Sequence, residues 1–200
     1  VRSSRQRQMC IRDRFENIEN KLKNKQKKFF RREWKKENIN EGGGVSYLLS
    51  NGNIFDKVGV NHSTVSGVFK KKYRSKILGA KKDGKYWASG ISVVAHMKNP
   101  KIPALHFNTR FIVTSKEWFG GGIDATPSFN DRSEAKMFHQ ELKKVCIKNK
   151  KNYKKYKKWC DKYFYLPHRK ETRGIGGLFF DYEIKNWYNN FKFVKELGLT

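Results

Sequence analysis

The sequence is poor in acidic residues, cysteine and proline. Asp and Glu together number 18 against 45 Lys and Arg, which gives a net charge of +27. Such a surface favours polyanionic partners, namely nucleic acid, acidic lipid or a multiply carboxylated small molecule. A lysine-biased, solvated surface without any functional meaning explains the charge equally well.

The three cysteines, Cys10, Cys146 and Cys160, form no CxxC pair. The N-terminus lacks the charged, apolar and small-residue regions that together make a secretory signal peptide. Both absences favour a reducing compartment, and we expect a cytoplasmic protein.

Long apolar runs are also absent. The longest, residues 91–95 and 177–180, are far shorter than the roughly 18 residues of a membrane span, so we expect a soluble protein without an integral membrane segment. The 200 residues are 37% hydrophobic, which is enough to bury one sizeable core but hardly two. The chain is therefore expected to form a single domain.

Residues 1–14 are basic and lack apolar periodicity. The string from Met9 to Asp13 looks like the translated end of a sequencing-library transposon. We therefore expect residues 1–14 to be a non-native leader outside the fold, and the domain to comprise residues 15–200.

From Phe15 onward the pattern predicts a helix, which the glycines at 42–44 should end. Residues 45–69 read as short strands with a hairpin at Asn51-Gly52. Residues 70–85 form a Lys- and Gly-rich loop, which is either an anion-binding flap or, as we favour, a solvated connection. Residues 131–165 predict two amphipathic helices. The helix expected from Phe15 onward has its apolar positions at Ile18, Leu22, Phe29, Phe30 and Trp34.

Two strand-like runs follow Gly90, separated by residues 97–103, and alternation divides each run into two faces. In the second run one face carries His106, Asn108 and Arg110. The other face carries Leu105, Phe107, Thr109 and Phe111. In the first run Ser92, Val94 and His96 oppose Ile91, Val93 and Ala95.

The polar face carries two imidazoles, an amide, a hydroxyl and a guanidinium. A solvated strand in this lysine-rich chain would be expected to carry Lys, Glu and Thr instead. Arg110 can grip a carboxylate through two parallel hydrogen bonds, Asn108 can donate and accept, and His106 can move a proton near neutral pH. This pattern indicates a pocket for a carboxylated ligand.

Three consecutive glycines, Gly120 to Gly122, precede Asp124. Glycines permit a backbone to approach a bulky, flat ligand closely. The alternative is a glycine-rich turn in which Asp124 is a capping residue. Neither a phosphate loop nor a dinucleotide fingerprint fits the spacing here or at 173–177.

These motifs resemble the oxygen-dependent coproporphyrinogen III oxidases in order and spacing, from about residue 34 to 193. The last two motifs are long and unlike those of other families. The matching segments are Gly59-Val60-Asn61, Gly90-Ile91-Ser92, His96 with Asn99-Pro100, Pro103 with His106-x-Asn108-x-Arg110, Trp118-Phe119-Gly120-Gly121-Gly122-x-Asp124-x-Thr126-Pro127, Lys158-Trp159-Cys160-Asp161-x-Tyr163-Phe164, and His168-Arg169-x-Glu171-x-Arg173-Gly174-Ile175-Gly176-Gly177-x-Phe179-Phe180-Asp181.

The resemblance implies oxidative decarboxylation of two propionates of coproporphyrinogen III to vinyl groups. The product would be protoporphyrinogen IX in haem biosynthesis, with O₂ as electron acceptor. It implies an α+β fold in which helices pack on the faces of an antiparallel sheet, and a homodimer for the full-length protein. By position, Ser92 and the segment Asn108, Thr109 and Arg110 would bind substrate, His106 would donate a proton, and Asp124 would anchor or deprotonate the pyrrole.

The resemblance implies no organic cofactor and leaves a divalent metal open. Some bacterial members are described with a metal held by four histidines, and others work without one. The matching positions are His96, His106, His139 and His168. Neutral imidazoles suit first-row transition metals, but histidines that hydrogen-bond around a substrate pocket are the alternative that we favour.

The segment from Lys154 to Trp159 suggests a different function. Lysines interleaved with aromatic residues can bind a single-stranded nucleic acid by stacking and phosphate contacts. The aromatic spacing of three to four residues also fits one face of a helix packed in a core, which we favour.

The chain departs from the family pattern at Met97, Ala125 and Tyr182. It also ends at Thr200, where family members continue through further strands and helices that supply substrate contacts and much of the dimer interface. We therefore expect a C-terminally truncated fragment that is inactive and poorly soluble by itself.

Overall fold

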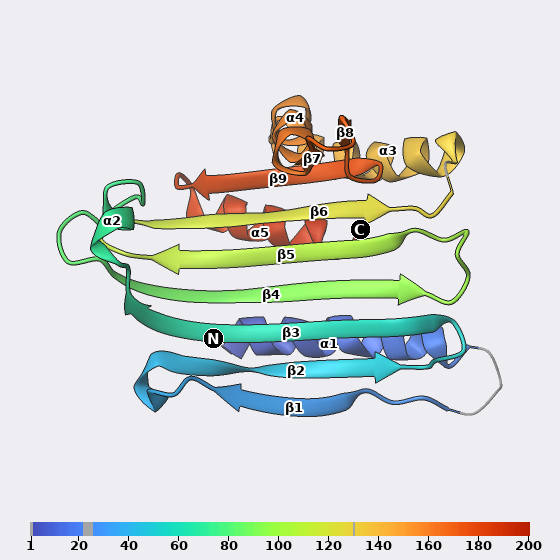
Figure 1. Cartoon of the computed structure of the whole chain (residues 1–200), viewed down its shortest axis with the longest axis horizontal. Helices are drawn as coiled ribbons and strands as arrows, with labels where there is room; N and C mark the ends of the chain where they lie inside the picture. Colours follow the sequence, from blue (N-terminus) through green and yellow to red (C-terminus); the bar gives the residue numbers. More distant parts are fainter. Residues whose placement is uncertain (1, 22–25, 130) are drawn as a thin grey trace.

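The computed structural model describes residues 2–21, 26–129 and 131–200, and it shows an antiparallel sheet of seven strands in the order β1-β2-β3-β4-β5-β6-β9 (Figure 1). A separate two-stranded sheet pairs β7 with β8. The strands are β1 (Phe30–Lys35), β2 (Gly42–Ser50), β3 (Phe55–Val68), β4 (Lys85–Met97), β5 (Ala104–Val113), β6 (Glu117–Thr126), β7 (Tyr165–Leu166), β8 (Glu171–Thr172) and β9 (Gly176–Glu183).

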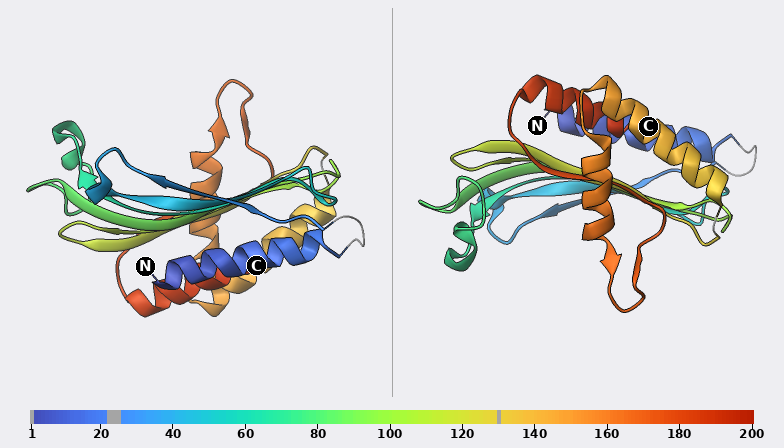
Figure 2. Two further views of the ribbon diagram at one scale, coloured as in Figure 1. Left: turned by 90° about the horizontal axis from the view of Figure 1, so that it is seen from below. Right: turned by 90° about the horizontal axis from the view of Figure 1, so that it is seen from above.

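The helices lie mainly on one face of the large sheet. Figure 2 shows α1, α3 and α5 on that face, whereas α4 crosses the β9 edge and the β7–β8 hairpin projects on the other side. The α+β class is confirmed, with the opposite face uncovered along most of its length. The helices are α1 (Arg2–Glu19), α2 (Lys71–Arg74), α3 (Arg132–Lys148), α4 (Tyr153–Tyr163) and α5 (Trp187–Leu197), with a 3-10 turn at Ile39–Glu41. None of the helices in the described ranges is long and apolar enough to cross a membrane.

Two clusters of buried side chains form the core beneath these helices. One lies between β6, β9 and the three C-terminal helices, where Phe180 and Phe193 are fully buried and meet edge to face. The other lies under α1 and includes Ile91, Val93 and Ala95, so the alternation predicted for β4 is confirmed. Each fully buried large side chain contributes about 2 kcal/mol to stability.

The helix predicted from Phe15 to the glycines at 42–44 is wrong beyond Glu19. The helix ends at Glu19, Phe30–Lys35 is the edge strand β1, and Leu22 lies outside the described residues. Pairing with β2 overrides the weak helical periodicity of this segment. The glycines expected to end the helix instead begin β2. They permit close pairing with β1, since a Cβ at Gly43 would lie 2.2 Å from the Trp34 carbonyl oxygen.

Residues 2–14 belong to α1, contrary to the expectation that residues 1–14 stand outside the fold. Gln8 is 2% exposed, and its Nε2 donates to the carbonyl oxygens of Val45 at 2.7 Å and Val60 at 2.9 Å. At the other end of α1, the buried Glu19 carboxylate accepts hydrogen bonds from the backbone N–H groups of residues 53, 54 and 55. Both halves of α1 are thereby joined to the β2–β3 hairpin.

The two amphipathic helices predicted for residues 131–165 are confirmed as α3 and α4. Asp131 caps α3 by accepting hydrogen bonds from two backbone N–H groups of the first turn, and Asn152 caps α4 by accepting one from the Lys155 N–H. Leu142 and Cys146 of α3 are fully buried.

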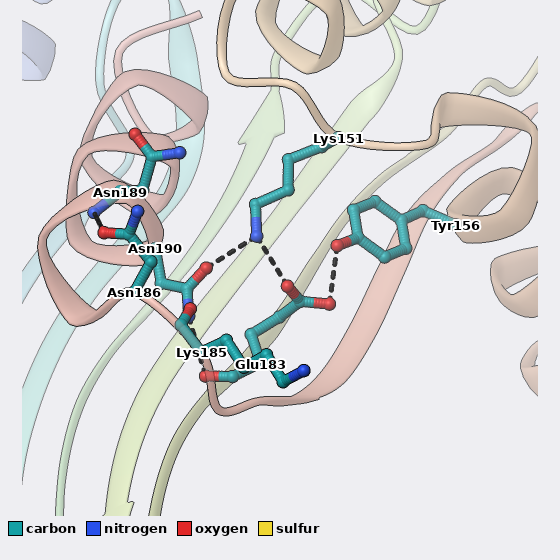
Figure 3. Close-up of polar contacts among 7 residues, drawn as sticks. All are labelled: Lys151, Tyr156, Glu183, Lys185, Asn186, Asn189 and Asn190. Atoms are coloured by element: carbon teal, nitrogen blue, oxygen red, sulfur yellow. Dashed lines mark hydrogen bonds and ion pairs between the residues drawn. The ribbon is translucent and has the colours of Figure 1, made fainter.

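A buried polar network joins α4 to β9 and α5 (Figure 3). Lys151 Nζ lies 2.5 Å from Glu183 Oε2 and donates to Asn190 Oδ1 at 2.6 Å, while the Tyr156 hydroxyl donates to Glu183 Oε1 at 2.6 Å. Burial and the bond to Glu183 raise the pKa of Tyr156 far above its ordinary value, so the phenol remains a donor. The network orients β9 relative to the helices.

Replacing Gln8 with alanine tests whether the first half of α1 is docked. Two buried carbonyl groups would lose their donor, so the free energy of unfolding should fall by about 2 kcal/mol in a urea titration. Gln6 is exposed on the same helix, and Gln6→Ala should change stability by less than about 0.5 kcal/mol. Equal effects of the two substitutions would place this segment outside the fold.

Thiol titration tests the burial of the cysteines. Burial raises the pKa of Cys146 to about 11 and that of Cys160 to about 12, whereas Cys10 is exposed. A higher pKa leaves less of the reactive thiolate at pH 8, so a disulfide reagent should modify Cys10 quickly in the native protein. All three cysteines should react in denaturant. Rapid reaction of three thiols in the native protein would contradict this packing.

Candidate functional site

Polar side chains lie in register on the uncovered face of the sheet. His106, Asn108 and Arg110 point to this face from β5, as the alternation predicts, while Phe107 packs against the core on the other face. Antiparallel pairing sets Ser92 opposite Asn108. Side chains on neighbouring strands therefore form rows across the sheet.

The glycine run lies inside strand β6, so the alternative of a glycine-rich turn is wrong. Gly120, Gly121 and Gly122 pair with Arg110, Thr109 and Asn108 of β5. A Cβ at Gly120 would lie 2.4 Å from Asp181 Oδ1 and 3.0 Å from Arg110 Nε. Because glycine lacks this Cβ, the Arg110 side chain can extend over β6, where its Nη2 donates to Asp181 Oδ2 at 2.8 Å.

Asp124 is the buried carboxylate of the site, with 3% of its surface exposed. It is not a capping residue. The Arg173 Nη2 donates to Asp124 Oδ2 at 2.7 Å, and His106 Nδ1 lies 3.4 Å from the same oxygen. The pair therefore sets an imidazole, which can transfer a proton at a ring nitrogen, beside a buried carboxylate.

Unpaired polar atoms surround Asp124. In the described part of the chain, His106 Nδ1, Thr126 Oγ1 and Arg173 Nε are buried without a hydrogen-bond partner. Buried polar atoms normally have partners, so this cluster is suited to a ligand that supplies donors and acceptors.

Sequence reasoning missed the role of Arg173. Its guanidinium lies 3.9 Å above the Phe164 ring, and the next residue, Gly174, has a φ of +59°. A Cβ on Gly174 would lie 2.3 Å from the Ala125 carbonyl oxygen, so glycine permits the close approach that brings Arg173 to Asp124. The only available signal was its place in the long motif from His168 to Asp181.

Thr109 lies on the opposite face from its neighbours. Its side chain is 9% exposed and shares the helix-covered face with Ile91 and Gly121. Any contact of this residue with a ligand on the uncovered face would therefore use its main chain. Ser92 and Asn108 line a groove of about 140 Å³ together with Asn61, Ser63 and Arg110, and Thr109 also contributes to its lining.

The four histidines proposed as metal ligands do not converge. His96 and His106 are neighbours, with ring centroids 6.2 Å apart, but His168 lies on the exposed loop between β7 and β8. His139 Nε2 donates to the Ile175 carbonyl oxygen at 2.7 Å, and its Nδ1 accepts from the Tyr153 hydroxyl at 2.9 Å.

Both nitrogens of His139 are thus engaged, which leaves none for a metal. No group of three or more His, Cys, Asp or Glu side chains in the described ranges has the arrangement of a metal site. The residues present do not fit a four-histidine centre.

The nucleic-acid interpretation of α4 loses its structural basis. Tyr156 is 3% exposed in the core, and Tyr163 stacks on Phe179 with ring centroids 4.2 Å apart. Trp159 meets the same Phe179 ring edge to face. Tyr156, Trp159 and Tyr163 therefore contact β9, as the spacing of three to four residues predicted, although Tyr163 remains 60% exposed.

Comparison with known proteins agrees with this picture. The family model described as coproporphyrinogen III oxidase matches residues 4–200. The chain is 51% identical over 175 residues to the oxygen-dependent coproporphyrinogen-III oxidase of Rickettsia akari (strain Hartford), which covers 86% of this chain and 62% of that protein. It is 51% identical over 173 residues to the same enzyme of Rickettsia bellii (strain OSU 85-389), covering 86% and 61%. The chain thus spans less than two thirds of the length of these curated relatives.

Replacing Arg173 with alanine tests the Asp124 ion pair. The substitution would leave a buried carboxylate without its charged partner, so the free energy of unfolding should fall by about 3 kcal/mol. Arg169 is the matched control, because it pairs with Glu171 where both side chains are more than half exposed; Arg169→Ala should cost less than about 1 kcal/mol. Equal losses in urea titrations would show that the Arg173–Asp124 pair is no stronger than a surface contact.

Proposed function

The chain belongs to the coproporphyrinogen III oxidase family, and we propose that it holds the substrate-binding face of an oxygen-dependent coproporphyrinogen-III oxidase. The whole enzyme would convert two propionates of coproporphyrinogen III to vinyl groups and form protoporphyrinogen IX in haem biosynthesis. The observation that carries this proposal is the polar face on which Arg110, Asn108 and His106 lie along β5, with His106 opposite Asp124 of β6.

The spacing along β5 suits a flat ligand with carboxylates at its rim. Arg110 and His106 are four residues apart on one strand, or roughly 14 Å. We assign Arg110 to a propionate carboxylate, with Asn108 and Ser92 as hydrogen-bonding groups beside it. The neighbouring strand β6 carries Gly122 opposite Asn108, so a macrocycle could lie close to the backbone there.

At the other end of this face, Asp124 would accept hydrogen bonds from pyrrole N–H groups, since its carboxylate is acceptor-only when ionised. Arg173 holds that carboxylate in place. Thr109 would contribute only main-chain groups, because its side chain lies on the other face.

The stoichiometry gives His106 its role. Each conversion of a propionate to a vinyl group releases CO₂, one proton and two electrons, and O₂ takes up the two electrons with two protons to form hydrogen peroxide. The balance is a net uptake of one proton per propionate. His106 beside Asp124 is the group that we assign as the proton donor.

We assign the enzyme to the cytoplasm and to a homodimer on the basis of the family resemblance. The free thiols of Cys146 and Cys160 fit a reducing compartment. We assign no step to a metal, because His139 is fully engaged in other hydrogen bonds.

Binding of a stable porphyrin tests this proposal. Coproporphyrin III carries four propionates, and its tetramethyl ester has the same macrocycle without charge. Fluorescence titration should show tighter binding of the acid, and Arg110→Ala should weaken that binding at least about tenfold through loss of a charge-assisted contact. Arg132→Ala removes the same charge from the exposed start of α3 and should leave the affinity unchanged. Equal affinity of wild type and Arg110→Ala would remove Arg110 from the binding site.

A further inference from the structure

Strand β9 contributes a carboxylate to the polar face that neither the alternation of β5 nor the family roles assign. Asp181 lies two strands away from Arg110, with only Gly120 of β6 between them. The Arg110 Nη2 donates to Asp181 Oδ2 at 2.8 Å. Because a Cβ at position 120 would contact both side chains, the pair depends on the glycine beneath it.

The backbone of β9 is distorted where Asp181 occurs. The register with β6 shifts between Phe119 and Gly121, so that residues 181 and 182 together lie opposite Gly120. Tyr182 has a φ of +55°, which is uncommon for a residue other than glycine. Bulges of this kind turn a side chain away from its regular direction and are frequent beside active sites.

Three donors hold the Asp181 carboxylate. Its Oδ1 accepts from Trp118 Nε1 at 3.0 Å and from the backbone N–H of Tyr182 at 3.0 Å, and its Oδ2 accepts from Arg110. Trp118 is 3% exposed and stacks on the Tyr182 ring. The carboxylate is therefore held by buried structure before any ligand arrives.

Arginine is a long side chain that loses much rotamer freedom when it is fixed. Asp181 engages only Nη2, and Asn108 Oδ1 lies 3.4 Å from Nη1. Of the five N–H donors of a guanidinium, most remain available to a ligand. The pair thus fixes the direction of the guanidinium without saturating it.

We propose that Asp181 is the positioning residue of Arg110. It holds the guanidinium over Gly120 and thereby determines the preference of the polar face for carboxylated ligands. The inference deepens the proposed function and rests on it for the identity of the ligand, whereas the pairing itself does not depend on that identity.

The first test is a double-mutant cycle with coproporphyrin III and its tetramethyl ester. Asp181→Asn keeps an acceptor for Trp118 but removes the charge that holds Arg110, so the preference for the acid over the ester should fall about tenfold. The same substitution in the Arg110→Ala background should have no further effect, because Asp181 acts only through Arg110.

The control is Glu141→Gln, which removes one negative charge from a surface pair with Lys144 and should leave both affinities unchanged. Thermal unfolding of each variant verifies that it folds. Tighter binding of the acid by Asp181→Asn would identify Asp181 as a competitor of the ligand, and an equal loss in the Arg110→Ala background would show that it acts by another route. Either result overturns the proposal.

A second readout is independent of the ligand. Phenylglyoxal modifies free guanidinium groups, and peptide mapping by mass spectrometry gives the rate at Arg110. Release from Asp181 should accelerate that modification several-fold in Asp181→Asn and leave it unchanged in Glu141→Gln. If the wild type does not distinguish acid from ester, the proposed function fails while this rate still decides the positioning role. An unchanged rate in Asp181→Asn would overturn it.

Discussion

The antiparallel register between β5 and β6 places His106 opposite Asp124 and Arg110 opposite Gly120. Since side chains alternate with a period of two, a slip of one residue would turn His106 and Arg110 toward the helices and bring Phe107 to the surface. The buried faces of Phe107 and Ile123 prevent that slip, because both pack against the C-terminal core cluster. The chemistry of the polar face therefore depends on the hydrophobic packing of the other face.

The two arginines of this face are each paired with a carboxylate supplied by a different part of the chain. Asp181 of β9 engages Arg110 of β5, and Arg173, which precedes β9, engages Asp124 of β6. Both pairs depend on where β9 lies, and β9 is held by the network of Lys151, Tyr156 and Glu183. The protein has a net charge of +27. Within it, Asp181 and Asp124 fix the positions of two arginine side chains in addition to neutralising their charge.

Periodicity predicted those elements whose burial pattern is local. The two faces of β4 and β5 and the amphipathic helices α3 and α4 follow from spacing, because one side of each packs against the core. Periodicity gave the wrong structure where pairing with a neighbouring strand decided the conformation. Phe30 and Trp34 suited a helix but form a strand on β2, and Gly120 to Gly122 suited a turn but form the middle of β6. In both places glycines lie close to the backbone of a neighbouring strand, Gly43 to that of Trp34 and Gly121 to that of Asn108, and a single sequence does not reveal which strands pair.

From its sequence alone, this protein presents a strand face with a guanidinium, an amide and an imidazole, because alternation is a property of the extended backbone itself. The family resemblance follows from motif order in the same way. Tertiary structure decided which partners those side chains have. Asp181 lies 71 residues from Arg110 and Arg173 lies 49 residues from Asp124, and only the placement of β9 beside β6 brings them together. His139 shows the same limit, because hydrogen bonds to Ile175 and Tyr153, rather than its place in a motif, determine what its nitrogens do.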